Sequence, residues 1–102
     1  MTVRAKFKYT GYEACQSNVL KRDAAGAVLK DENGRETYEL VELRTLKFQP
    51  VYPGSDPNHE NAKFWAYTPS GEVRLGTVNP QAWSQFEMGK EYFLDFSLAP
   101  ES

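Results

Sequence analysis

The chain has 102 residues, a mass of 11.6 kDa and a formal net charge of −2, and 40% of its residues are hydrophobic. This length allows one hydrophobic core, so we expect a single β-rich domain over residues 1–102. Six tyrosines, six phenylalanines and two tryptophans argue against disorder, because disordered segments are poor in aromatic residues. The balanced charge argues against binding of nucleic acid or anionic membranes over the whole surface, and leaves room for one basic face.

The cysteine content and the hydropathy of the chain bear on its cellular location. Cys15 is the only cysteine, which excludes an intrachain disulfide and a cysteine-based zinc site within one chain. No apolar stretch approaches the roughly 20 residues that span a bilayer. The N-terminal segment also lacks the apolar region of a secretory signal. The sequence therefore predicts a cytoplasmic protein that has no membrane partner.

The first predicted element is a strand over residues 3–10. One side would carry Val3, Ala5, Phe7 and Tyr9, and the other Arg4, Lys6, Lys8 and Thr10. This period of two is typical of a half-buried strand. Gly11 then predicts a bend or bulge, with residues 12–19 continuing the strand less regularly.

Residues 21–35 contain two turn signals. One is Asp23–Gly26, and the other centres on the Asn33–Gly34 pair, which is typical of a type I′ hairpin. The short apolar run 27–29 between them is expected to be an edge strand, with a single helical turn as the alternative.

Residues 37–49 form the longest strand candidate. Their apolar positions change phase between Leu40 and Val41, which predicts a β-bulge at that point. A helix is the alternative, because residues 39–43 have fair helix propensity. The frequent Tyr, Thr, Val and Phe residues favour the strand.

Two elements are expected after this strand. The proline-rich residues 50–61 predict a loop. An aromatic run at 64–67 is followed by Thr-Pro-Ser-Gly, which fits a type I turn. We therefore expect a hairpin that pairs residues 64–68 with residues 72–78.

A short helix and a last strand complete the prediction. Asn79 is a suitable N-cap, Pro80 suits the first helical position and Gly89 suits the stop, so we expect a helix near 80–88. Residues 91–98 alternate like a strand. Together the elements predict a mostly β fold, as a small antiparallel barrel or sandwich with one short α-helix near 80–88.

Few residues suggest catalytic chemistry. His59, the only histidine, lies in the proline-rich loop and is expected to be solvated rather than a general base or a metal ligand. Nothing local supports a pair with Cys15, which is expected to be a small core residue. The sequence also lacks the glycine-rich phosphate-binding motifs. We expect no enzyme activity, no cofactor and no metal.

A basic row on the first strand is the strongest candidate for binding. Its members would lie about 6.6 Å apart on one face, close to the spacing of phosphates in an extended single strand. An exposed aromatic such as Tyr67, Phe93 or Tyr12 would offer a stacking platform. The candidate ligand-binding residues are Arg4, Lys6, Lys8, Lys63, Tyr67 and Arg74. The alternative is a solvated face whose lysines deter edge-to-edge pairing.

Several segments resemble small uncharacterised proteins of tailed bacteriophages. They are the opening Val-Arg-Ala-Lys-Phe at 3–7, then FWAYTPSG at 64–71, LGTVN at 75–79, FEMGKEY at 86–92 and the Asp-Phe pair at 95–96. The resemblance covers residues 3–8 and about 60–97, while residues 10–36 depart from it. It implies a phage product that acts in the infected host cytoplasm or in the virion, and it assigns no activity and no site.

These observations lead to one expected function and one alternative. We expect a non-enzymatic phage accessory protein that captures a phosphate-bearing ligand, either an immune-signal nucleotide or single-stranded nucleic acid. The alternative is a virion or assembly protein that acts through protein–protein contacts. Large rings on both sides of segments 64–67 and 92–96 also predict a homo-oligomer, unless residues 11–36 cover one of these faces.

Overall fold

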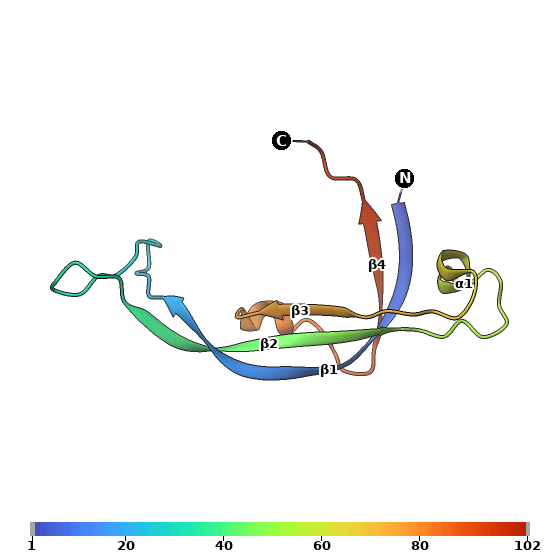
Figure 1. Cartoon of the computed structure of the whole chain (residues 1–102), viewed down its shortest axis with the longest axis horizontal. Coiled ribbons are helices and arrows are strands. Elements are labelled where there is room, and N and C mark those ends of the chain that lie inside the picture. Colours follow the sequence, from blue (N-terminus) through green and yellow to red (C-terminus); the bar gives the residue numbers. More distant parts are fainter. Residues whose placement is uncertain (1, 102) are drawn as a thin grey trace.

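The computed structural model describes residues 2–101 as one antiparallel sheet with two short helices (Figure 1). In chain order the elements are β1 (Thr2–Leu20), β2 (Tyr38–Pro50), α1 (Glu60–Trp65), β3 (Val73–Thr77), α2 (Pro80–Trp83) and β4 (Glu91–Ser97). The strand order across the sheet is β3-β2-β1-β4. The mostly β fold is confirmed. The sheet is not closed, so the barrel or sandwich stays a prediction.

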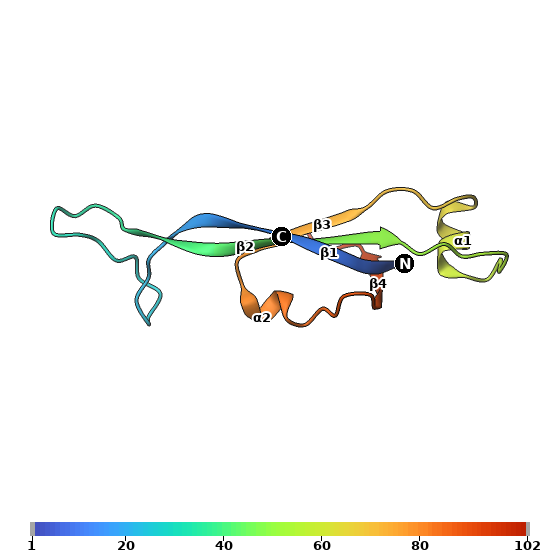
Figure 2. The same cartoon turned by 90° about the horizontal axis from the view of Figure 1, so that it is seen from below.

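The long hairpin of β1 and β2 dominates the shape. β4 pairs with β1 only over residues 2–8, and β3 pairs with β2 only over residues 44–48. Beyond them the outer edges of the hairpin have no neighbouring strand, on β1 from residue 12 and on β2 up to residue 43, and this part forms an arm of residues 12–43 that ends in a tip of residues 21–37 (Figures 1 and 2). The radius of gyration is 19.1 Å, against about 13 Å for a compact chain of 100 residues. The arm therefore projects from the sheet, and residues 11–36 do not fold back over it.

The core lies on one face of the sheet, which we call the core face. The alternation predicted for residues 3–10 is confirmed, because Ala5, Phe7 and Tyr9 are buried there. Leu46 and Phe48 of β2 complete this small buried set. Partly buried side chains pack around it, and they are Trp65, Val73, Trp83, Phe86, Tyr92 and Leu94. The core interpretation of Trp65 and Trp83 is thus confirmed.

The bulge lies in β1 and not in β2. The register shifts between Tyr9 and Gly11, as the glycine predicts, whereas β2 pairs without interruption past Leu40 and Val41. The bulge predicted at Leu40 is therefore wrong. The apolar residues of this stretch change phase because neither face of the arm is covered, so burial does not restrict them to one side.

The predicted hairpin of residues 64–68 with 72–78 is wrong, because helix α1 begins inside the predicted loop and ends at Trp65. His59 is its N-cap, and its Nδ1 atom accepts a hydrogen bond of 3.0 Å from the Asn61 amide. Trp65 then packs edge-on against Phe7, with ring centroids 6.1 Å apart. This cap and this contact outweigh the strand propensity of the aromatic run.

The second helix begins where the sequence predicts and ends early. The Asn79 side chain accepts a hydrogen bond of 3.1 Å from the Gln81 amide, which confirms the predicted cap. The helix ends at Trp83 rather than near residue 88, and turns lead on to Gly89. The last strand is confirmed as β4.

The tip contains turns in place of the expected edge strand. Residues 27–29 form no strand, and Val28 makes an isolated bridge with Arg22. The type I′ turn is also wrong, because Gly34 has a φ of 78° while Asn33 is not among the residues with positive φ. The Gly34 amide donates to the Asp31 carbonyl, which is typical of a type I turn closed by a left-handed glycine.

Candidate functional site

The predicted basic row lies on the face opposite the core. Arg4, Lys6 and Lys8 alternate with the buried residues of β1, so the pleat directs all three side chains away from the core. Two of them are engaged by acids of other elements. Arg4 donates two hydrogen bonds to Asp95 of β4, at 2.6 and 3.0 Å. The Lys6 Nζ atom lies 3.9 Å from a carboxylate oxygen of Glu60.

These pairs leave the row with little free positive charge. The hydrogen bond from Arg4 lowers the pKa of Asp95 and raises that of Arg4 itself. A backbone hydrogen bond, and then attraction to Lys6, lower the pKa of Glu60 against the opposing effect of burial. Lys8 forms no ion pair within residues 2–101, and its register partner in β4 is Glu91. This face therefore carries alternating positive and negative side chains, and the basic row is not a continuous positive surface.

Phe93 contributes an aromatic ring to this face. Its ring is 49% exposed, with the Arg4 guanidinium 4.3 Å and the Lys6 ammonium 5.3 Å from the ring centroid. Each distance lies within the range of a cation–π contact. The ring is thus already in contact with two of the protein's own cations.

The other predicted site residues lie elsewhere. Arg74 is on β3, the opposite edge strand of the sheet, where it pairs with Glu72 at 3.1 Å. Lys63 is on α1, and Tyr67 follows that helix with 87% of its surface exposed. Tyr67 lines a separate hollow of about 260 Å³, beside Tyr52. The six predicted residues therefore do not converge on one cavity.

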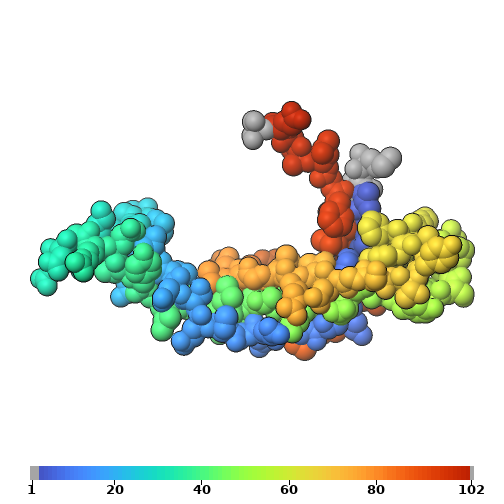
Figure 3. Space-filling model, in the orientation of Figure 1, coloured from blue at the N-terminus to red at the C-terminus, as the bar shows by residue number. Residues whose placement is uncertain are grey.

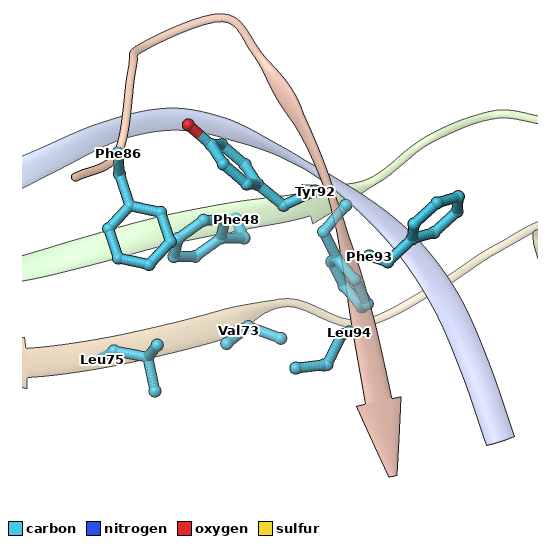
Figure 4. A pocket seen from close by; sticks show the side chains of 8 residues that line it. Phe48, Val73, Leu75, Phe86, Tyr92, Phe93 and Leu94 are labelled. Atoms are coloured by element: carbon cyan, nitrogen blue, oxygen red, sulfur yellow. The ribbon is translucent and has the colours of Figure 1, made fainter. Parts of the chain in front are cut away.

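An apolar groove on the core face was not predicted from the sequence. It has a volume of about 170 Å³, and its lining residues are Phe7, Phe48, Val73, Leu75, Phe86, Tyr92, Phe93 and Leu94 (Figure 4). Side chains of β3 lie on one side of the groove and Tyr92 and Leu94 of β4 on the other, whereas the Phe93 ring points away from the groove toward the opposite face of the sheet. Such a lining suits an apolar side chain better than a charged ligand.

The tip of the arm is the most regular feature of the surface. Three backbone amides form a closed ring of hydrogen bonds: Lys21 donates to Thr37, Thr37 to Leu29 and Leu29 to Lys21, at 2.9, 3.0 and 2.9 Å. The three positions are eight residues apart. The ring separates two lobes, residues 22–28 and 30–36, from the rest of the arm. The tip that contains them projects from the rest of the molecule in the space-filling view (Figure 3).

The two lobes share one structure. In the first, the Asp23 carboxylate accepts hydrogen bonds from two backbone amides, at 2.9 and 3.0 Å, and Gly26 has a φ of 88°. In the second, Asp31 accepts the equivalent pair, and Gly34 takes the glycine position. The two turns were predicted separately and their repeat was missed, although the Asp-x-x-Gly pattern at a spacing of eight residues could have predicted this tip.

Cys15 is exposed on the arm, which corrects its assignment to the core. Among residues 2–101, no group of three or more His, Cys, Asp or Glu side chains is placed to hold a metal ion. None of the described helices is long and apolar enough to cross a membrane. No family model, no curated protein and no solved structure matches the chain.

Proposed function

We propose that the protein is a non-enzymatic accessory protein of tailed bacteriophages that acts through protein–protein contacts, in the virion or in its assembly. The arm with its ordered tip is the observation that supports this function. Holding one residue in place costs about 1–2 kcal/mol of backbone entropy, and the tip has no core beneath it to offset this cost. Local hydrogen bonds order it instead. An ordered and exposed projection of this kind is suited to a partner surface.

The balance of charge favours this function over phosphate capture. A protein that binds phosphates uses cations that are free to neutralise them. Arg4, Lys6 and Arg74 each have a carboxylate partner of their own, which a phosphate ligand would have to displace.

Removal of the two lobes tests the role of the tip. In this variant residues 22–36 are replaced by Asn-Gly, a two-residue turn that suits the hydrogen-bonded pair of Lys21 and Thr37. We expect its core to unfold at the same denaturant concentration as that of the wild type. We expect it to lose co-sedimentation with particles of the phage that encodes it, whereas the wild type is retained with them.

Two glycines provide a matched control. Gly34 in the tip and Gly54 in the loop before α1 have φ values of 78° and 67°, and a Cβ atom at either meets nothing within 4 Å. Valine therefore introduces similar backbone strain at both positions. Gly34→Val should weaken co-sedimentation, and Gly54→Val should leave it unchanged. Equal retention of the lobeless variant and the wild type would contradict the proposed function.

Phosphate capture remains the second candidate, and the half-exposed Phe93 ring beside two cations supports it. If it holds, wild-type protein binds oligothymidylate or a cyclic dinucleotide, and oligothymidylate affinity falls steeply with salt. Lys6→Glu then abolishes binding without unfolding the domain, while Lys30→Glu in the tip serves as the matched charge reversal. Fluorescence anisotropy with labelled probes measures both. Equal binding by Lys6→Glu and wild type would exclude the basic row as the site.

A further inference from the structure

We propose that two copies of this chain pair antiparallel along the free edge of β1, residues 12–20, about a two-fold axis at Gln16. Their two sheets then join into one. This inference goes beyond the proposed function, because it concerns the edge of the arm and not its tip. It holds or fails whether or not the tip binds a phage particle.

The edge is open to a further strand. The Lys21 amide donates to the Thr37 carbonyl of the other side of the hairpin. In an antiparallel ladder every second residue bonds to the same neighbour, so residues 19, 17, 15 and 13 also bond to β2. The N–H and C=O groups of residues 12, 14, 16, 18 and 20 therefore point to the other side. In the described chain, β4 pairs with β1 only as far as Lys8, so no strand occupies this side.

The composition of this edge sets it apart from the other strand edges. Residues 12–20 contain no proline and no glycine, and their one charged residue, Glu13, is paired with Lys47 of β2. Proteins usually protect an exposed edge with charged side chains, proline or a bulge. The other free edges do carry charges: Glu39 and Glu42 on the arm part of β2, Arg74 on β3, and Glu91 and Asp95 on β4. Only the edge of β1 is left suited to pairing.

The edge is complementary to itself, which identifies the occupant as a second copy. With Gln16 opposite its own equivalent, Tyr12 faces Leu20 of the second copy. The two belong to the core side of the arm, where Tyr38 is the register partner of Leu20. Tyr12 and Tyr38 are 41% and 56% exposed in the single chain. Pairing brings these side chains into one row at each end of the interface, which favours association.

Charge decides against the same pairing through β2. Self-pairing of its residues 38–43 would bring the Glu39 carboxylates of the two copies onto one face of a short ladder, whereas Glu42 is paired with Arg44 of its own chain. Like charges at such close range are destabilising. The extended single chain, with its radius of gyration of 19.1 Å, is also what a subunit that completes its sheet with a second copy would show.

A charge placed on the axis tests the interface. We expect wild-type protein at tens of micromolar to have about twice the 11.6 kDa chain mass by multi-angle light scattering. Gln16→Lys sets two ammonium groups side by side at the axis, and should reduce the mass to that of one chain. Leu40→Lys puts the same charge on the other strand of the arm and should stay dimeric. A wild-type monomer, or a dimeric Gln16→Lys variant with wild-type affinity, would overturn the proposal.

Cysteine pairing tests the register. With the axis at Gln16, Cys15 lies opposite Ser17 of the second copy in a non-hydrogen-bonded pair, where side chains are closest. Ser17→Cys should therefore form a covalent dimer under mild oxidation, because Cys15 of each copy then faces the introduced thiol of the other. Val19→Cys also adds a second cysteine on the same face, but opposes neither to another, and should cross-link no faster than the wild type. Equal rates for the two variants would contradict this register.

Discussion

Replacing Phe48 with alanine is expected to reduce the free energy of unfolding by about 3–5 kcal/mol, the usual cost of removing a large ring from a core. Phe48 is 4% exposed, and its ring centroid lies 5.2 Å from Tyr9 and 5.4 Å from Phe86. Small domains have total stabilities of about 5–15 kcal/mol. One side chain therefore accounts for a large share of the stability of so small a core. Urea denaturation followed by tryptophan fluorescence measures the change.

Leu40→Ala is the control for Phe48→Ala. Leu40 lies on the same strand, but 63% of its surface is exposed on the arm. Its truncation should cost less than about 1 kcal/mol, as is usual for surface positions. If both variants lost the same stability, the arm and the core would form one cooperative packing unit, contrary to the separation described above.

Replacing Asn61 with alanine is expected to cost about 2–4 kcal/mol, because it leaves buried backbone groups without partners. Asn61 is fully buried, and its side chain bridges the backbones of Lys6 and Val51, between which the Val51 amide also donates a hydrogen bond of 3.1 Å to the Lys6 carbonyl. Its Oδ1 atom accepts a hydrogen bond of 2.6 Å from the Lys6 amide, and its Nδ2 atom donates to the Lys6 and Val51 carbonyls at 2.8 and 2.7 Å. The Lys6 amide and the Val51 carbonyl, just beyond the end of β2 at Pro50, are the groups that lose this partner in the variant.

His59→Ala separates this role from helix capping. It removes the N-cap of α1 and keeps the Asn61 carboxamide, so it should cost only about 1 kcal/mol. Thermal unfolding of both variants gives the comparison. A loss for Asn61→Ala no greater than that for His59→Ala would show that the carboxamide contributes only as part of the helix cap.

The sequence predicts those elements whose signals are local and face the core. The alternation of β1 around Phe7 and the Asn79 cap of α2 are of this kind, and both are confirmed. Helix α1 was missed because its stabilising contacts are distant in sequence. Asn61 accepts a hydrogen bond from Lys6, 55 residues away, and no local sequence pattern predicts that bond. The groove was missed for the same reason, since its two sides come from β3 and β4.

The candidate site likewise combines a local feature that the sequence predicts with distant contacts that it does not. The strand pleat predicts correctly that Arg4 and Lys6 share a face. The acids that neutralise them could not be predicted, because Asp95 and Glu60 come from β4 and α1. The alternation along one strand thus predicts the face on which a charged side chain lies. The net charge of that face depends on other elements, which only the fold brings close.

The ring of hydrogen bonds at Lys21, Leu29 and Thr37 has a consequence for how the tip tolerates change. It closes each lobe at its base, so that one lobe can change without a change in the other or in the strands. Residues inserted between Arg22 and Val28 lengthen that lobe without moving the strands below it, because loop length costs little free energy. The tip can therefore diversify in length and sequence while the strands that carry it remain the same.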